Sequence, residues 1–365
     1  LITGPGFGRS QTEAYSNSLS NMNKLQTILI TGSLPFDLEI IKLDTISPSI
    51  GSEFVKNAVV VGILAIIAGS VILFLAIFFA GKLISWWGQQ QDAETSAILS
   101  IILDPLETSL ETYKGNELSS SAELRIYNDK CSVDGNFGSQ KLGAVTESGL
   151  GTKWREPFYG HSTKNEYIFS RDTEQGKKFM VFSMPFNFPF KVSSLIFLSS
   201  EDYCFLDAPD EIKDKFQGSK ITKIKFSDTK SNCSKQSIKV CFGSGVDCDS
   251  DEIVVYGNTG GYDYGSVIKN GNEVYYTGSL LYGAIFSSPE LYECNVNRLV
   301  KRTINLAYLY KDKIEFVQKR GCDSQLDIPL TNLINTAKEF KSSKDLSDLQ
   351  VIAKEIEDTG GCKIY

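Results

Sequence analysis

The stretch AVVVGILAIIAGSVILFLAIFFA, residues 58–80, decides the architecture of this chain, because no charged residue lies between Asn57 and Gly81. The 25 residues from Asn57 to Gly81 reach about 37 Å as an α-helix, which exceeds a hydrocarbon layer of about 30 Å. Lys56 and Lys82 bracket the run, and two tryptophans follow at 86 and 87, the residue types of a membrane interface. The sequence therefore predicts one transmembrane helix at about residues 57–81.

A buried core helix and a signal peptide are also apolar, but both fit this run less well. A helix buried in a soluble protein is rarely so long and so free of charge. A cleavable signal peptide is shorter and starts nearer to the N-terminus. No ionisable residue interrupts the run, so this helix alone carries no proton relay. We expect an integral membrane protein whose first partner is the lipid bilayer.

The rest of the chain, about 340 residues, has a globular composition, with 42% hydrophobic and 22% charged residues overall. That length suits one large or two moderate domains. The net charge is −7 and the pI is near 5.1. Without a basic cluster, this balance argues against a nucleic-acid partner.

All eight cysteines follow the apolar run. An even number on one side of a membrane helix indicates an oxidising compartment and up to four disulfides, whereas scattered buried thiols are the alternative. With no CxxC and one histidine, we expect no zinc site and no cofactor. The disulfide candidates are Cys131, Cys204, Cys233, Cys241, Cys248, Cys294, Cys322 and Cys362.

The sequence on each side of the apolar run has its own pattern of elements. Before it, a β-α-β fragment too small to bury a core is predicted, with a strand at 1–5, a helix at 10–29 begun by the capping pair Ser10 and Glu13, a strand at 34–46, and a turn at Pro48 and Gly51. After it, we expect a polar linker at 88–96 and a helix within 97–115 that Pro105 limits. A β-rich region follows, with long loops over 132–175, a hairpin at 266–278 that turns at Asn270-Gly271, and strands at 121–128, 178–186, 192–200, 221–228, 237–244 and 252–257. The last predicted elements are helices from Ser287 to Gly321, at 329–341 and at 344–358.

The residues that lead into the apolar run resemble SecD, an accessory membrane subunit of the Sec protein-export machinery, and most of all archaeal SecD. The resemblance rests on ITGPG at 2–6 and LQTILITGSLPFDLEIIKLDTISPSIGSEFVKNA at 25–58, and it covers residues 1–82. It implies that residues 1–50 are the last part of an external head domain that handles translocating polypeptide. The motif positions are Gly32, Leu34, Pro35, Pro48, Ile50 and Gly51.

The chain also departs from the SecD pattern. It begins with Leu1, and no second hydrophobic span follows residue 82, so we expect no complete proton-coupled export motor. A fragment of a longer protein, a true fusion and a join of two unrelated genes all remain open. Residues 83–365 resemble uncharacterised membrane-anchored proteins of small archaea, which implies no activity.

Together these features predict a membrane-anchored α+β protein, with a β-α-β fragment, one transmembrane helix, a mostly antiparallel β domain and a C-terminal helical subdomain. The expected divisions are a SecD-like head-domain fragment at 1–53, the transmembrane helix at 54–85, a linker and short helix at 86–118, a β-rich domain at 119–286 and the helical subdomain at 287–365.

The sequence features disagree about the orientation of the chain in the membrane. A SecD-like topology places the cysteine-bearing domain in the cytoplasm, whereas the cysteines favour the outside. Lys42 and Lys56 stand before the helix and Lys82 alone after it, which slightly favours an N-terminus inside. We expect a single-pass protein of the cell membrane with an extracytoplasmic C-terminal domain.

Few residues suggest a chemical site. Asp247, Asp249 and Asp251 resemble the start of a calcium loop, but Glu252 stands where an EF-hand needs glycine, so a solvated acidic turn is the better interpretation. The Gly/Tyr segment at 258–266 lacks the Lys-Ser/Thr of a phosphate loop and is typical of a flexible loop, with a binding loop as the alternative. His161 is expected in a loop, and no spacing pairs it with a nucleophilic cysteine.

The sequence therefore predicts no enzyme and no catalytic residue. The leading hypothesis is a non-enzymatic role in Sec-dependent protein translocation, with Sec translocon subunits and translocating polypeptide as partners. The alternative is a membrane-tethered, extracytoplasmic, disulfide-containing binding or surface module that has no part in export.

Overall fold

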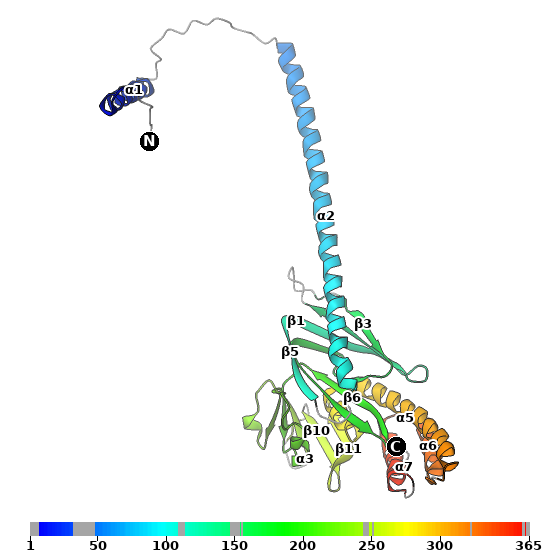
Figure 1. Ribbon diagram of the computed structural model, residues 1–365. Coiled ribbons are helices and arrows are strands. Elements are labelled where there is room, and N and C mark those ends of the chain that lie inside the picture. Colours follow the sequence, from blue (N-terminus) through cyan, green and yellow to red (C-terminus); the bar gives the residue numbers. More distant parts are fainter. Residues whose placement is uncertain are drawn as a thin grey trace. The chain divides into compact units, whose positions relative to one another are not determined.

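The computed structural model describes residues 7–31, 48–108, 114–146, 154, 156–243, 248–249, 252–321, 323–359 and 362 (Figure 1). The chain divides into two units, residues 1–79 and 80–365. Helix α2 (Pro48–Thr108) contributes to both. We call the described residues between 114 and 362 the C-terminal domain.

Helix α1 (Gln11–Thr31) begins where its capping residues predict. Ser10 Oγ accepts a hydrogen bond from the N–H of Glu13 at 3.3 Å, and the Glu13 carboxylate accepts one from the N–H of Arg9 at 3.0 Å. These bonds satisfy backbone donors that the first helical turn leaves unpaired. The predicted helix at 10–29 is confirmed, and the strands predicted at 1–5 and 34–46 lie outside the described residues.

The apolar run lies within α2. The segment Ser52–Leu83 is 32 residues long, and its apolar window of 18 residues has a mean hydropathy of 3.0 and is not buried. Ile66 is 73% exposed and Phe74 is 68% exposed. A continuous apolar surface of this length suits the hydrocarbon core of a bilayer. Among the described residues, it is the one helix long and apolar enough to cross a membrane, and it contains the predicted span at 57–81.

Helix α2 extends further than the sequence predicts in both directions. It starts at Pro48, so the expected turn at Pro48 and Gly51 is helix instead. Proline is favoured at the first helical position because its missing N–H is unpaired there in any case. The helix also continues through the expected linker at 88–96, where Gln, Ala and Glu are good helix formers. Pro105 lies in its last turn, where it removes one backbone hydrogen bond without ending the helix at once.

Sheet A is six-stranded, with the order β3-β2-β1-β5-β6-β4. Its neighbours are antiparallel except that β4 runs parallel to β6. The loops predicted over 132–175 are wrong, because β2, β3 and β4 lie there. The strands are β1 (Lys114–Ser132), β2 (Ser139–Thr146), β3 (Phe158–Thr163), β4 (Tyr167–Phe169), β5 (Thr173–Asn187) and β6 (Lys191–Ser199).

Sheet B is also six-stranded, with the order β12-β11-β10-β9-β7-β8. The predicted hairpin is confirmed, because Asn270 (φ 51°) and Gly271 (φ 75°) make the turn between β11 and β12. Strands β8, β7, β9 and β10 run parallel to one another, which the sequence did not predict. The elements are β7 (Tyr203–Leu206), α3 (Asp210–Asp214), β8 (Ile224–Ser227), η1 (Lys230–Asn232), β9 (Ile238–Phe242), β10 (Ile253–Asn258), β11 (Gly261–Lys269) and β12 (Asn272–Thr277).

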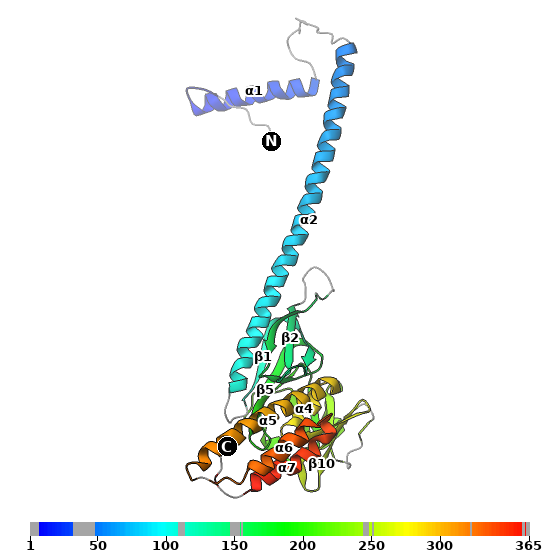
Figure 2. The same cartoon turned by 90° about the vertical axis from the view of Figure 1, so that its right-hand side faces the viewer.

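Helices complete the C-terminal domain, and α6 lies beside both α5 and α7 (Figure 2). Pro289 occupies the first turn of α5 after Ser288, and Gly321 follows its end with a φ of 85°. The helices predicted in the last 80 residues are thereby confirmed. They are α4 (Leu280–Phe286), α5 (Pro289–Gln318), α6 (Asp327–Lys338), η2 (Ser343–Asp345) and α7 (Leu346–Asp358).

One core serves strands and helices together. It runs from Phe182 of β5 through Phe205 of β7 and Phe286 of α4 to Ile356 of α7. The predicted boundary at 286 thus divides elements that share one core. A smaller cluster, which includes Phe179 of β5, is built from strands of sheet A alone. A flat sheet cannot bury one face against itself, so sheet A curls.

Candidate functional site

Disulfide bonds fasten the C-terminal domain. One joins the end of β1 to the first turns of α5 with its Cα atoms 6.3 Å apart, and the other two tie strands β7 and β9 to connecting segments. Cys362 is also disulfide-bonded, whereas Cys322 lies outside the described residues. No cysteine is free in the described part of the chain. The three described pairs are Cys131–Cys294, Cys204–Cys233 and Cys241–Cys248.

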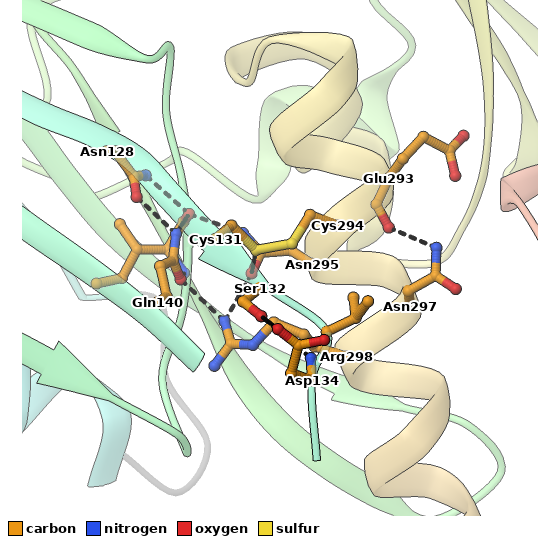
Figure 3. The surroundings of a disulfide bond; sticks show 12 residues. Asn128, Cys131, Ser132, Asp134, Gln140, Glu293, Cys294, Asn295, Asn297 and Arg298 are labelled. Carbon is orange, nitrogen blue, oxygen red and sulfur yellow. Dashed lines mark hydrogen bonds between the residues drawn. A yellow bond between two sulfur atoms is a disulfide. The ribbon is translucent and has the colours of Figure 1, made fainter. Parts of the chain in front are cut away.

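Polar side chains surround the Cys131–Cys294 bond (Figure 3). The amide of Gln140 on β2 donates to the carbonyl of Ile168 at 2.7 Å and accepts from its N–H at 3.0 Å. Asn128 and Asn295 donate to the same carbonyl at 3.1 and 3.0 Å. Because β4 has a strand partner on one side only, the Gln140 amide takes the place of a second strand and holds sheet A in its curled form.

Arg298 of α5 lies at the centre of this network and is fully buried. Its guanidinium donates to Asn295 Oδ1 at 2.8 Å and to Gln140 Oε1 at 3.1 Å, and it stacks 4.7 Å from the ring centroid of Tyr167. Burial lowers the pKa of Arg298 to about 10. The hydrogen-bond acceptors of this buried cation are neutral, and the carboxylate of Glu166 offsets only part of the effect of burial. These contacts fix α5 on sheet A.

His161 does not lie in a loop, as the sequence predicted. It is in β3 opposite Leu142 of β2 and is buried, where its Nε2 contacts the Glu166 carboxylate. Every described cysteine is disulfide-bonded, so the structure brings no thiol nucleophile to this histidine.

A pocket of about 480 Å³ lies where both sheets meet helices α4 and α5. We call it the charged pocket, because Arg171, Asp172 and Lys269 line it. Its wall is otherwise largely apolar, and the remaining lining residues are Thr173, Tyr203, Ile238, Ile253, Asn270, Ile285, Phe286, Ser287, Ser288 and Pro289.

Arg171 is fixed at this pocket by two carboxylates. Its Nη2 lies 3.0 Å from Oε2 of Glu174 and 2.6 Å from Oε1 of Glu201. Glu174 is fully buried and also accepts from the N–H of Ser200 at 2.8 Å. Burial lowers the pKa of Arg171, but the two carboxylates outweigh it and leave that pKa above its ordinary value. The guanidinium is therefore held in place before any ligand arrives.

Lys269 brings a second basic side chain to the pocket. Its ammonium group donates to the carbonyls of Ala284 and Ile285 at 3.1 Å each, and to that of Ser287. These carbonyls end α4, where the helix dipole favours a positive charge. Burial first, and Arg171 second, lower the pKa of Lys269 to about 7.

Two serines precede α5 at the same pocket. The Ser287 hydroxyl is buried and has no hydrogen-bond partner among the described residues. The Ser288 hydroxyl donates to Asp172 at 2.6 Å and does not cap the helix. The charged pocket therefore offers fixed charges of both signs, an unpaired hydroxyl and an apolar wall, which suits the binding of a ligand that is part polar and part apolar.

The calcium candidates divide between described and undescribed residues. Asp247 and Asp251 lie outside the described residues, and Asp249 lies 3.3 Å from the ammonium group of Lys230. The nearby Glu252 is paired with the same lysine at 2.9 Å. The sulfurs of Cys241 and Cys248 also lie near Glu252, but they are bonded to each other. Lys230 thus pairs with the two described carboxylates of this segment, Asp249 and Glu252.

The SecD-like motif is described only in part. Gly32, Leu34 and Pro35 lie outside the described residues, whereas Pro48, Ile50 and Gly51 form the start of α2. The motif residues that the structure describes therefore open the helix that contains the apolar run.

Comparison with known proteins finds one partial similarity. The chain is 32% identical over 74 residues to the protein-export membrane protein SecD of Methanothermobacter thermautotrophicus. One segment of this chain is SecD-like. The match covers 20% of this chain and 17% of that SecD. No protein-family model matches the chain, and no solved structure matches it.

The pocket residues were not predicted from the sequence. Arg171 and Lys269 are 98 positions apart in the numbering, and no motif surrounds either of them. Lys269 directly precedes the predicted Asn270-Gly271 turn, which is the one local signal that could have drawn attention to it. Arg298 and Gln140 were missed because each is an ordinary polar residue until its partner is known.

Proposed function

We propose that this protein serves Sec-dependent protein translocation at the membrane without catalysing a reaction itself. The observation that carries the proposal is the SecD-like segment, which is 32% identical to an archaeal SecD over 74 residues, in a chain whose α2 is apolar enough to cross a membrane. Its ligand would be an extended or hydrophobic segment of translocating polypeptide. Its partners would be the bilayer and subunits of the Sec translocon.

The disulfides support an extracytoplasmic C-terminal domain. Disulfides form and persist in oxidising compartments and are rare in the cytoplasm of most organisms. The domain contains three described disulfides, and Cys362 is bonded as well. The SecD-like orientation would place this domain in the cytoplasm, so the proposal takes the segment from SecD but not its direction across the membrane.

The state of the ionisable groups supports a binding role over a catalytic one. Arg171 is held by Glu174 and Glu201, Lys269 by three backbone carbonyls, and His161 contacts Glu166. Catalysis by a nucleophile needs a base within hydrogen-bond reach of it. At the charged pocket the Ser288 hydroxyl donates to the Asp172 carboxylate at 2.6 Å, but no further described side chain holds that carboxylate in the way a catalytic triad holds its base.

Copurification tests the role in export. We expect the full chain, affinity-tagged in native membranes, to copurify with the translocon channel subunits. The matched control replaces residues 1–83 with an unrelated apolar anchor and keeps residues 84–365, and it should lose those subunits. Absence of every Sec component from the full-chain sample would overturn the proposal.

Cysteine labelling tests the orientation independently. Gln217→Cys and Gln11→Cys place single thiols at exposed positions on opposite sides of the apolar segment in sequence. In intact cells, a membrane-impermeant maleimide should label Gln217→Cys and spare Gln11→Cys until the membrane is permeabilised. The reverse pattern would place the C-terminal domain in the cytoplasm.

A membrane-tethered binding module unrelated to export is the second candidate. The charged pocket favours it, because a pocket of about 480 Å³ with fixed Arg171 and Lys269 suits a small ligand. The short extent of the similarity, 17% of SecD, points the same way. Copurification separates the two candidates, since this module needs no Sec subunit.

A further inference from the structure

A second pocket, of about 300 Å³, lies between sheet B and the start of α7. We call it the tyrosine pocket, because Tyr256, Tyr264, Tyr275 and Tyr276 line it. The Gly/Tyr segment at 258–266, expected as a flexible loop, is instead largely the turn and first half of the β10–β11 hairpin. Its last residues form one side of this pocket.

Strand register places Tyr256, Tyr264 and Tyr275 on one face, whereas Tyr276 belongs to the opposite, buried face. Tyr256 of β10, Ser266 of β11 and Tyr275 of β12 are direct cross-strand neighbours, and Tyr264 pairs with Thr277 in the next row of the same face. Tyr256 is 39% exposed and Tyr264 is 47% exposed, whereas Ser266 is buried. A small side chain between two large rings leaves a hollow with aromatic sides.

The lining of this hollow is uncharged but can form hydrogen bonds. None of its residues is Asp, Glu, Lys, Arg or His, in contrast to the charged pocket. The Thr277 hydroxyl is bonded to Oε1 of Gln350 in α7. That bond fixes the Gln350 side chain and leaves its NH₂ group without a partner among the described residues. Aromatic faces with a few fixed amide and hydroxyl groups match a ligand that has C–H faces and many hydroxyls.

The geometry points to a neutral oligosaccharide as the ligand of the tyrosine pocket, and we propose this site independently of any role in export. A sugar ring would stack on Tyr264 and Tyr256 and direct its hydroxyls towards Gln350 and Ser266. A peptide strand is a poorer occupant, because the edge of β12 is already used. The N–H of Tyr275 donates to Ser343 Oγ at 2.9 Å, and its carbonyl accepts from the Tyr292 hydroxyl at 2.6 Å.

Ligand-observed NMR of the full chain tests the site. The protein should be held in lipid nanodiscs, because sugar-based detergents would compete for the pocket. The probes are mannotriose, maltotriose and chitotriose, with a proline-rich peptide as the competing class. We expect saturation transfer to at least one neutral trisaccharide, with a Kd below about 10 mM.

Variants connect the signal to the pocket. Tyr264→Ala should weaken binding about tenfold, the effect of losing an aromatic contact of roughly 1.4 kcal/mol, and Tyr264→Phe should retain it. Gln350→Ala, which leaves the hairpin intact, gives a second measurement if Tyr264→Ala fails to fold. Tyr308→Ala, an exposed tyrosine on α5, is the matched control and should bind normally. Binding of no trisaccharide, equal binding by Tyr264→Ala and the control, or Tyr264-dependent binding of the peptide would each overturn the proposal.

Discussion

The apolar segment of α2 and the C-terminal domain handle charge in opposite ways. Between Asn57 and Gly81 the helix has no charged residue at all, and its side chains are exposed for lipid to cover. The domain buries Arg298 and Glu174 completely and surrounds each with hydrogen-bond partners. A membrane span needs only the right composition, whereas a folded domain with buried charges needs particular residues to meet.

This difference predicts how each region fails. A substitution in the span acts through the free energy of transferring its side chain into the bilayer. Exchanging one apolar residue for another there should therefore have little effect. A substitution in the domain removes one member of a pair and leaves the other buried without a partner, which costs more than the bond itself.

The largest effect is expected at the disulfide that ties β1 to α5. The double variant Cys131→Ser and Cys294→Ser opens a loop of 163 residues, and should lower the free energy of unfolding by about 4 to 5 kcal/mol. Urea unfolding followed by circular dichroism measures the loss. The matched control, Cys204→Ser with Cys233→Ser, opens 29 residues and should cost about 1.5 kcal/mol less. Equal losses would contradict the chain-entropy account.

The next effect concerns the buried cation. Arg298→Leu removes the donor to Gln140, Asn295 and Thr163, so two buried acceptors and one partly buried acceptor lose a partner, and stability should fall by about 3 to 4 kcal/mol. Arg302→Leu, on the same helix but partly exposed, donates to Val192 at 2.8 Å and should cost about 1 kcal/mol. Similar unfolding midpoints for the two variants would show that Arg298 carries no special weight.

The same contrast explains what could be predicted from the sequence. The span at 57–81 was predictable because length and composition are local, and the Asn270-Gly271 hairpin because two adjacent residues determine its turn. Strand β4 was missed because three residues give no period. The partner of Cys131 could not be chosen among the 105 pairings that eight cysteines allow. Arg298 resembles an ordinary helix residue until Gln140, 158 positions away, is known to lie beside it.

A charge placed in the span tests the other side of the comparison. Leu73→Arg should raise the apparent free energy of membrane insertion by about 3 kcal/mol, because Leu73 is 64% exposed and no described side chain lies ready to pair with arginine. A glycosylation-based insertion assay measures this shift. Leu73→Ala is the control for lost side-chain volume and should change insertion by less than about 1 kcal/mol. An arginine tolerated as well as alanine would indicate a partner for this face within the membrane.

The smallest effect on stability is expected at Glu117, whose hydrogen-bond partner Thr222 is distant in sequence and whose site is solvent-accessible. Glu117 of β1 accepts hydrogen bonds from the N–H and hydroxyl of Thr222, both at 2.6 Å. Burial raises its pKa, but these bonds, with Lys178 and Lys223 nearby, leave that pKa below the usual value. A carboxylate whose pKa is lower in the folded than in the unfolded state stabilises the fold fully at a pH above the pKa of the unfolded state. This contribution is lost as the pH falls through the pKa of the folded state. Glu117→Gln should therefore reduce stability at neutral pH by less than about 1 kcal/mol and remove part of the loss seen below pH of about 4.5. The control is Glu357→Gln, at an exposed residue of α7. If Glu117→Gln lowered stability as much as Arg298→Leu, burial would not be what makes these pairings important for stability.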